Sequence, residues 1–119
     1  MEIVEIESIP FNVNPIGGWY DPTRWGYGDR KNAKTESLEY RILRITTDDG
    51  AEGYHVGGNG HYWSAPPQSV VDNLIKPLLI GEDPLNRELL WQWMTNHKGL
   101  SEGVVGSIDS ALWDLLGRM

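Results

Sequence analysis

The sequence predicts an α+β fold in which a three-stranded antiparallel meander is followed by three to four helices. Two observations lead to this prediction. Stretches rich in β-branched residues occupy the first half of the 119-residue chain and end at turn signals. The second half carries apolar residues at helical spacing, with capping residues near the expected helix starts. Because the strands precede the helices and do not alternate with them, we expect the helices to cover one face of the sheet.

Three strands are expected in the first half of the chain. Residues Glu2–Ile9 mix β-branched residues with glutamate and then meet Pro10, which indicates a strand near a sheet edge. The second strand is Tyr40–Thr47. The Asp-Asp-Gly sequence at 48–50 predicts a tight turn, in which glycine supplies a positive φ. Ala51–Val56 then returns as the third strand of the meander.

Three helices are expected after the sheet. The first opens at Pro67, and Pro77 ends or kinks it because proline lacks an amide hydrogen. In the second, Asp83 is a good N-cap and Pro84 suits the first helical position. Ser101 caps the third. The residues expected to face inward share helical spacing: Val70, Val71, Leu74 and Ile75 in the first helix, Leu85, Leu89, Leu90, Trp93 and Met94 in the second, and Val105, Ile108, Leu112, Leu115 and Leu116 in the third.

Two long loops interrupt this scheme. About two dozen residues rich in glycine, proline and aromatic side chains separate the first two strands, far more than a hairpin needs. A second aromatic loop, Gly57–Pro67, follows the third strand. Long loops inside a compact domain are usually functional or disordered, and the tryptophans and tyrosines argue against plain disorder. These aromatic side chains either contact a ligand or form a satellite cluster that holds the loop in place.

Composition excludes several classes of protein. The formal net charge is −7 and the ten basic residues are scattered, which argues against nucleic-acid binding. The absence of cysteine excludes disulfides, thiolate metal sites and a cysteine nucleophile. The first residues are acidic rather than signal-like, and no apolar stretch approaches the ~20 residues of a membrane span. We therefore expect a cytoplasmic protein without nucleic-acid or membrane partners.

Few polar residues suggest chemistry by themselves. His55 and His61 are either acid–base or substrate-binding residues or hydrogen-bonded loop residues, and neither has an orienting carboxylate nearby in sequence. His97 is expected to be structural, at a helix end where the dipole favours a cation. Asp109 and Asp114 lie five residues apart on the last helix, do not face one another, and are also expected to be structural. No catalytic residue and no metal site is predicted within the chain.

Four separated segments resemble one known family, in the same order along the chain. They are Arg44–Tyr54, Pro77–Pro84, Leu89–Met94 and Ser107–Arg118, the last reading Ser-Ile-Asp-Ser-Ala-Leu-Trp-Asp-Leu-Leu-Gly-Arg. The chain thus resembles the N-terminal capping domain of the enolase superfamily, in its mandelate racemase and muconate lactonizing enzyme branch. One departure is the family's common Gly-Trp-Gly-Glu, which reads Gly-Tyr-His-Val at 53–56 here. This change affects the loop that follows.

The resemblance implies that residues 1–119 form a lid, followed in the complete enzyme by a (β/α) barrel. It also implies that the two loops close over the barrel mouth and that this chain alone is inactive. Mg²⁺ would be held by three barrel carboxylates, with lysine or histidine bases nearby. All of these residues would lie beyond Met119, so this chain is expected to bind no metal. Pocket closure and substrate discrimination would fall to Trp19, Tyr20, Trp25, Tyr27, His55, Asn59, His61 and Tyr62.

The parent enzyme implied by the resemblance is a Mg²⁺-dependent lyase or isomerase acting on a small carboxylic acid. An acid-sugar dehydratase, racemase or isomerase fits, with the C-terminal barrel and the substrate as partners and self-association into a homo-oligomer. Two alternatives stay open. The chain is a stand-alone binding or oligomerisation module, or it is an inactive truncated fragment, which the abrupt end after a helix favours.

Overall fold

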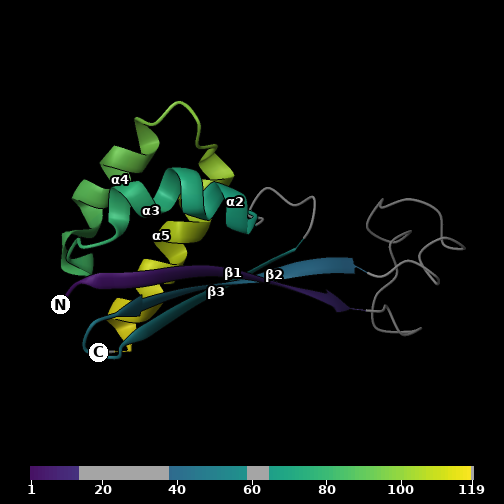
Figure 1. The fold of residues 1–119 in the computed structure, drawn as a ribbon, viewed down its shortest axis with the longest axis horizontal. Helices are drawn as coiled ribbons and strands as arrows, with labels where there is room; N and C mark the ends of the chain where they lie inside the picture. Colours follow the sequence, from purple (N-terminus) through teal and green to yellow (C-terminus); the bar gives the residue numbers. More distant parts are fainter. Residues whose placement is uncertain (14–37, 59–64, 119) are drawn as a thin grey trace, which may run out of the picture.

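The expected order, strands before helices, is confirmed by the computed structural model. It describes residues 1–13, 38–58 and 65–118. A sheet of three strands lies beneath a layer of helices that covers one of its faces (Figure 1). The elements are β1 (Ile3–Val13), β2 (Leu38–Thr47), β3 (Glu52–Gly58), α2 (Gln68–Val70), η2 (Val71–Ile75), α3 (Lys76–Leu79), η3 (Pro84–Asn86), α4 (Arg87–Thr95) and α5 (Glu102–Gly117).

The sheet is the predicted antiparallel meander, in the order β1-β2-β3. Ile45 of β2 pairs with Ile6 of β1 on one side and with Gly53 of β3 on the other. Gly50 has a φ of 87°, which confirms the tight turn between β2 and β3. β1 continues through Pro10 to Val13, further than expected. Proline is tolerated there because β1 is an edge strand, where one side of the backbone needs no ladder partner.

Other parts of the chain occupy both sheet edges. At the β3 edge, the Tyr54 amide donates to Asp114 Oδ2 of α5 at 2.8 Å. At the β1 edge, the Ile3 amide and carbonyl bond the backbone at residues 81–82, both at 2.9 Å. Unpaired strand edges are templates for association with other strands. These bonds therefore limit edge-to-edge pairing, and they give Asp114 the structural role expected of it.

The core lies between the sheet and the helices. α5 packs mainly on β3 and also on β2. Four of the five residues in its predicted stripe are buried, and Leu116 is half-buried. In the part of the chain that the structure describes, no helix has the length and apolar character needed to cross a membrane. The buried apolar residues are Ile3, Ile6, Leu43, Ile45, Ala65, Val71, Ile75, Leu79, Leu90, Met94, Leu100, Val105, Ile108, Ala111, Leu112 and Leu115.

Only part of the inward face predicted for the second helix is correct. Leu90 and Met94 are fully buried. Leu85, Leu89 and Trp93 were expected inward but are 64%, 43% and 37% exposed. α4 is short and apolar over much of its circumference, and its buried residues form a narrow i, i+4 stripe. Helical spacing alone does not show which of several apolar faces of a helix packs against the core.

Of the two outcomes predicted at Pro77, an end or a kink of the first helix, the end does not occur, because the helical path runs on to Leu79. Five residues before it, Val71–Ile75, form a π-helical turn in which the Lys76 amide reaches the Val71 carbonyl. Wider turns of this kind and prolines both disturb the α-helical ladder, and they commonly mark irregular helices. The two later caps are confirmed: the Leu85 amide donates to Asp83 Oδ1 at 2.9 Å, and the Val104 amide donates to Ser101 Oγ at 3.3 Å.

A lysine ties the first helical segment to β1. Lys76 Nζ lies 2.7 Å from Glu5 Oε1 and 3.0 Å from Asp72 Oδ1. The hydrogen bond from Lys76 lowers the pKa of the Glu5 carboxyl below its ordinary value of 4.5. Gln68, followed by Lys76, lowers the pKa of Asp72 below 3.8. A lowered carboxyl pKa stabilises the folded state above the unfolded pKa, and this stabilisation is lost as pH falls through the folded pKa.

We therefore expect the folded chain to lose stability as the pH falls below about 4.5, and the Lys76→Met variant to lose less over that interval. The measurement is the urea midpoint at a series of pH values from 6 down to 3. Lys98→Met, at an exposed residue, is the control, and its urea midpoint should change with pH as steeply as that of the wild type. Equal slopes for Lys76→Met and the wild type would show that this cluster does not drive the acid sensitivity.

Candidate functional site

The two segments that carry the predicted binding residues attach at one end of the sheet. Val13, the last residue of β1, pairs with Leu38, the first of β2. Gly58, the last residue of β3, pairs with Tyr40 beside them. Segments 14–37 and 59–64 therefore leave from neighbouring strand ends (Figure 1). This loop end of the sheet therefore carries both segments for which the sequence predicts substrate contacts.

Apolar side chains line the open sheet face near the loop end. The rings of Phe11 and Tyr40 stack with centroids 5.7 Å apart. One pleat further along, Ile9, Ile42 and Val56 form a cross-strand row. Val56 is 57% exposed and Ile9 39%. The surface beside the segment attachments is thus apolar, as expected of a face that contacts another part of a protein.

The return from the second segment is fixed to β1. The Ser8 amide donates to Gln68 Oε1 at 2.7 Å, and the Ser8 hydroxyl donates to the Pro66 carbonyl at 2.5 Å. Ser8, Ala65 and Pro66 are all buried. These bonds hold residues 65–68 against the first strand. The chain that follows segment 59–64 is therefore bonded to β1.

His55 is the single predicted binding residue within the described part of the chain. It lies in β3 and pairs with Leu43 of β2, which in turn pairs with Ser8. This row belongs to the helix-covered face, and the His55 side chain is only half-buried. The other seven lie outside the described residues and stay predictions: Trp19, Tyr20, Trp25, Tyr27, Asn59, His61 and Tyr62.

The charged groups of the open sheet face form a structural network. Arg44 donates to both carboxylate oxygens of Glu7, at 2.7 and 2.8 Å, and this bond raises the pKa of Arg44. The Tyr54 hydroxyl donates to the Glu52 carboxylate, which raises the pKa of Tyr54 above its ordinary value of 10.0. Both groups therefore keep their protons at neutral pH. Neither is poised to abstract a proton from a substrate.

His97 has a structural role in the turn that follows α4, as the sequence predicts. Its Nδ1 accepts a hydrogen bond from the Gly99 amide at 3.0 Å. The side chain therefore closes this turn.

The described residues hold no metal centre. Across 1–13, 38–58 and 65–118, no three histidine or acidic side chains lie close enough to coordinate an ion. Several carboxylates there are engaged in ion pairs, for example Asp109 with Arg87 and Asp114 with Arg118. The described residues therefore do not provide the cluster of oxygen ligands that Mg²⁺ requires.

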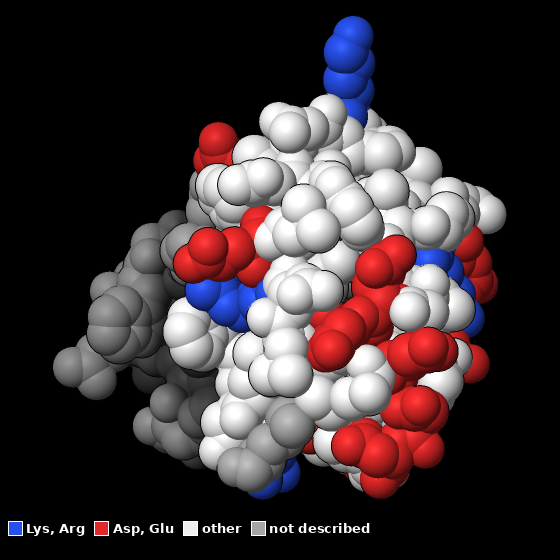
Figure 2. Space-filling model, turned by 90° about the vertical axis from the view of Figure 1, so that its left-hand side faces the viewer, with Lys and Arg blue, Asp and Glu red and all other residues white. Residues whose placement is uncertain are grey.

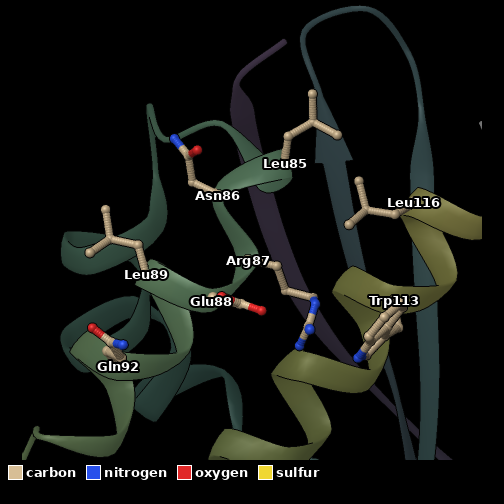
Figure 3. Close-up of a pocket in the computed structure, with 8 residues that line it drawn as sticks. All are labelled: Leu85, Asn86, Arg87, Glu88, Leu89, Gln92, Trp113 and Leu116. Carbon is tan, nitrogen blue, oxygen red and sulfur yellow. The ribbon is translucent and has the colours of Figure 1, made fainter.

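A hollow lies away from the loop end, between α4 and α5 (Figure 3). Arg87 and Asp109 form an ion pair at 2.9 Å, with side chains only 19% and 20% exposed. The Arg87 guanidinium also lies 4.0 Å from the centre of the Trp113 ring. The hollow is lined by Leu85, Asn86, Arg87, Glu88, Leu89, Gln92, Trp113 and Leu116.

Sequence reasoning missed this hollow. Its two walls come from segments about two dozen residues apart, and Arg87 and Asp109 show no local spacing signal. The one available clue was the excess of apolar residues around the second helix, which was interpreted as core.

Figure 2 faces the end of the domain that carries the N-terminus and shows uncharged surface beside a concentration of acidic side chains.

Known proteins resemble the chain over most of its length. The family profile described as mandelate racemase / muconate lactonizing enzyme, N-terminal domain, matches residues 30–119. A D-galactonate dehydratase family member of Paenibacillus sp. strain JDR-2 is 35% identical over 85 residues, which cover 66% of this chain and 21% of the relative. The arabinonate dehydratase of Saccharolobus solfataricus is 30% identical over 95 residues, which cover 74% of this chain and 25% of the relative.

The fold also matches solved structures. A crystal structure of D-glucarate dehydratase from Agrobacterium tumefaciens, complexed with magnesium, superimposes with a TM-score of 0.66 and 26% identity. The match covers 99% of this chain and 30% of that one. The chain therefore spans between a fifth and a third of the length of the proteins it matches.

Proposed function

Because the chain belongs to the mandelate racemase / muconate lactonizing enzyme family, as its N-terminal domain, we propose that it is the substrate-capping domain of a Mg²⁺-dependent acid-sugar dehydratase or isomerase. Residues 1–119 form the lid in this proposal, and a C-terminal (β/α) barrel in the same polypeptide supplies the catalytic groups. The observation that carries the proposal is the attachment of segments 14–37 and 59–64 at one end of the sheet.

Two further facts support this proposal. The dehydratases similar to this chain are named for sugar acids, galactonate, arabinonate and glucarate. The predicted loop residues combine aromatic rings with polar tips and amide or imidazole groups, which suit a hydroxylated carboxylic acid. A lid of this composition excludes water and selects substrates while the barrel performs proton transfer. His55 then acts at the edge of the pocket in substrate contact or loop support.

The described residues take no part in proton transfer under this proposal. In such reactions a bound divalent cation stabilises the negative charge left after a proton is removed next to a carboxylate. The described part of this chain contains no fitting ligand set, so the barrel would hold the ion. The contribution of this domain is to orient and enclose the substrate.

The test is the activity of the full-length polypeptide that contains this domain. We expect it to convert one or more sugar acids with Mg²⁺, to lose activity with EDTA, and to regain it when Mg²⁺ is restored. The 119-residue chain alone should show no turnover. Formation of a 2-keto acid, the tautomer of the enol left by dehydration, gives a direct assay. Turnover by the 119-residue chain alone, or full-length protein inert towards carboxylic acids, would contradict the proposal.

A matched pair of variants separates capping from general stability. His61→Ala and Tyr62→Phe, in the predicted lid, should change kcat/KM by about tenfold and alter the ranking of substrates. Val4→Ala, at an exposed residue of β1, should leave that ranking unchanged. An identical ranking in all variants would indicate that these loop residues lie away from the substrate.

A further inference from the structure

The side chain of Gln68 pairs with the free edge of β1 much as a further strand would. Its Oε1 accepts a hydrogen bond from the Ser8 amide at 2.7 Å, and its Nε2 donates to the Ile6 carbonyl at 3.4 Å. One carboxamide thus satisfies a donor and an acceptor of an edge strand, groups that otherwise need water or another strand. Because Gln68 is the first residue of α2, this pairing fixes the start of the helical layer to β1.

A charged neighbour fixes the orientation of this carboxamide. Nε2 of Gln68 also donates to Asp72 Oδ1 at 2.9 Å. Asp72 is ionised at neutral pH, because Gln68 and then Lys76 lower its pKa below the ordinary value of 3.8. An ionised carboxylate only accepts hydrogen bonds, so it holds the NH₂ group of Gln68 and leaves Oε1 for the Ser8 amide. The side chain is therefore held at both of its polar atoms.

A second bond joins the same position of β1 to the chain just after segment 59–64. The Ser8 hydroxyl donates to the Pro66 carbonyl at 2.5 Å. Both residues are buried, so water competes little for this bond. Pro66 lies two residues beyond the segment, and two residues span at most about 7 Å. The Ser8–Gln68 clasp, formed by Ser8, Pro66 and Gln68, therefore restricts where segment 59–64 ends.

The clasp also relates the two segments that carry predicted binding residues. β1 contains Ser8 and ends at Val13, where segment 14–37 begins. Segment 59–64 begins after Gly58 of β3 and is followed by the clasp on β1. One strand thus carries an attachment of each segment. Figure 1 shows α2 on the side of the helical layer that faces the loop end, and α4 on the opposite side.

We infer that Gln68 is a positioning residue for substrate discrimination, because its clasp with Ser8 sets where the chain that carries His61 and Tyr62 rejoins the domain. The inference rests on the proposed function, since it requires that segment 59–64 contacts the substrate. Gln68 itself does not contact the substrate, because β1 and Asp72 occupy its carboxamide. It acts through the placement of the chain, and a misplacement of about 1 Å is enough to reduce enzymatic rates strongly.

The experiment compares Gln68→Met with Asp83→Ala in the full-length polypeptide. Methionine has about the length of glutamine but cannot reproduce the two hydrogen bonds of the carboxamide to β1. Asp83→Ala removes the cap on the Leu85 amide, away from the loop end. Each variant should lower the thermal midpoint by about 3 °C. The pair therefore separates the loss of the clasp from a general loss of stability.

Gln68→Met should raise the KM for sugar acids by about tenfold and change kcat by less than about threefold. The ratio of kcat/KM between two sugar acids should change as well. Hydrogen exchange of the peptide that contains Ser8 should become at least about tenfold faster. Asp83→Ala should leave these three quantities at their wild-type values. Ser8→Ala, which removes only the hydroxyl bond to Pro66, should reproduce the change in KM and in substrate ranking.

The possible outcomes distinguish this inference from the proposed function. An active enzyme that keeps its KM and substrate ranking in both Gln68→Met and Ser8→Ala would overturn the inference alone. Equal kinetic changes in Asp83→Ala would also overturn it, because loss of stability would then explain them. So would unchanged exchange of the Ser8 peptide in Gln68→Met. A wild-type enzyme inert towards sugar acids would instead refute the proposed function, and this inference with it.

Discussion

Gly53→Ala is expected to destabilise the folded chain by about 3 kcal/mol, a large share of the stability of a small domain. A Cβ placed on Gly53 would lie 2.3 Å from the Ala111 carbonyl oxygen and 2.5 Å from the Leu115 Cβ. Both atoms belong to the framework of α5, so the methyl group cannot be accommodated by rotating a side chain. The helix itself must move away from the sheet, and it carries much of the core.

Urea unfolding, followed by circular dichroism, measures this effect. Gly117→Ala is the matched control, because nothing lies within 4 Å of its added Cβ and the residue ends α5. Alanine favours helix over glycine, so this variant should be as stable as the wild type or more so by up to about 1 kcal/mol. Equal midpoints for Gly53→Ala and Gly117→Ala would show that α5 does not approach β3 this closely.

The fold was largely predictable because its signals are local. The Asp-Asp-Gly turn fixes the β2–β3 hairpin, and Gly50 adopts the expected positive φ. Asp83 and Ser101 begin their helical segments as capping chemistry requires. The stripe of α5 is buried because it meets a sheet face that also needs cover. In each case the residues that encode the feature lie within a few positions of it.

The features that sequence reasoning missed depend on distant contacts. Whether Leu85 and Leu89 face the core or the hollow between α4 and α5 depends on where α5 lies, and their own spacing contains no such information. The helix continues past Pro77 after a π-helical turn, and the local sequence pattern does not predict such a turn. The pairing of Arg87 with Asp109 joins two helices. The predicted binding residues other than His55 lie outside the described residues, so the lid remains a prediction.

Asp109→Ala is expected to cost about 2 kcal/mol, because it leaves the Arg87 guanidinium largely buried and without its carboxylate partner. Arg87→Met removes the charge but keeps an apolar chain against Trp113, so its cost should come mainly from the unpaired Asp109. If the two side chains act as a pair, the double variant should be more stable than the sum of the single effects predicts. The coupling in this cycle should be about 1–2 kcal/mol.

The Arg118–Asp114 pair provides the contrast for this cycle. Its N–O distance is the same, 2.9 Å, but the Arg118 side chain is 61% exposed, compared with 19% for Arg87. Arg118→Met should therefore change the free energy of unfolding by less than about 0.5 kcal/mol. A coupling below that value for Arg87 and Asp109 would mean that burial adds nothing to their pairing. The walls of the hollow between α4 and α5 would then be held in place by apolar contacts alone.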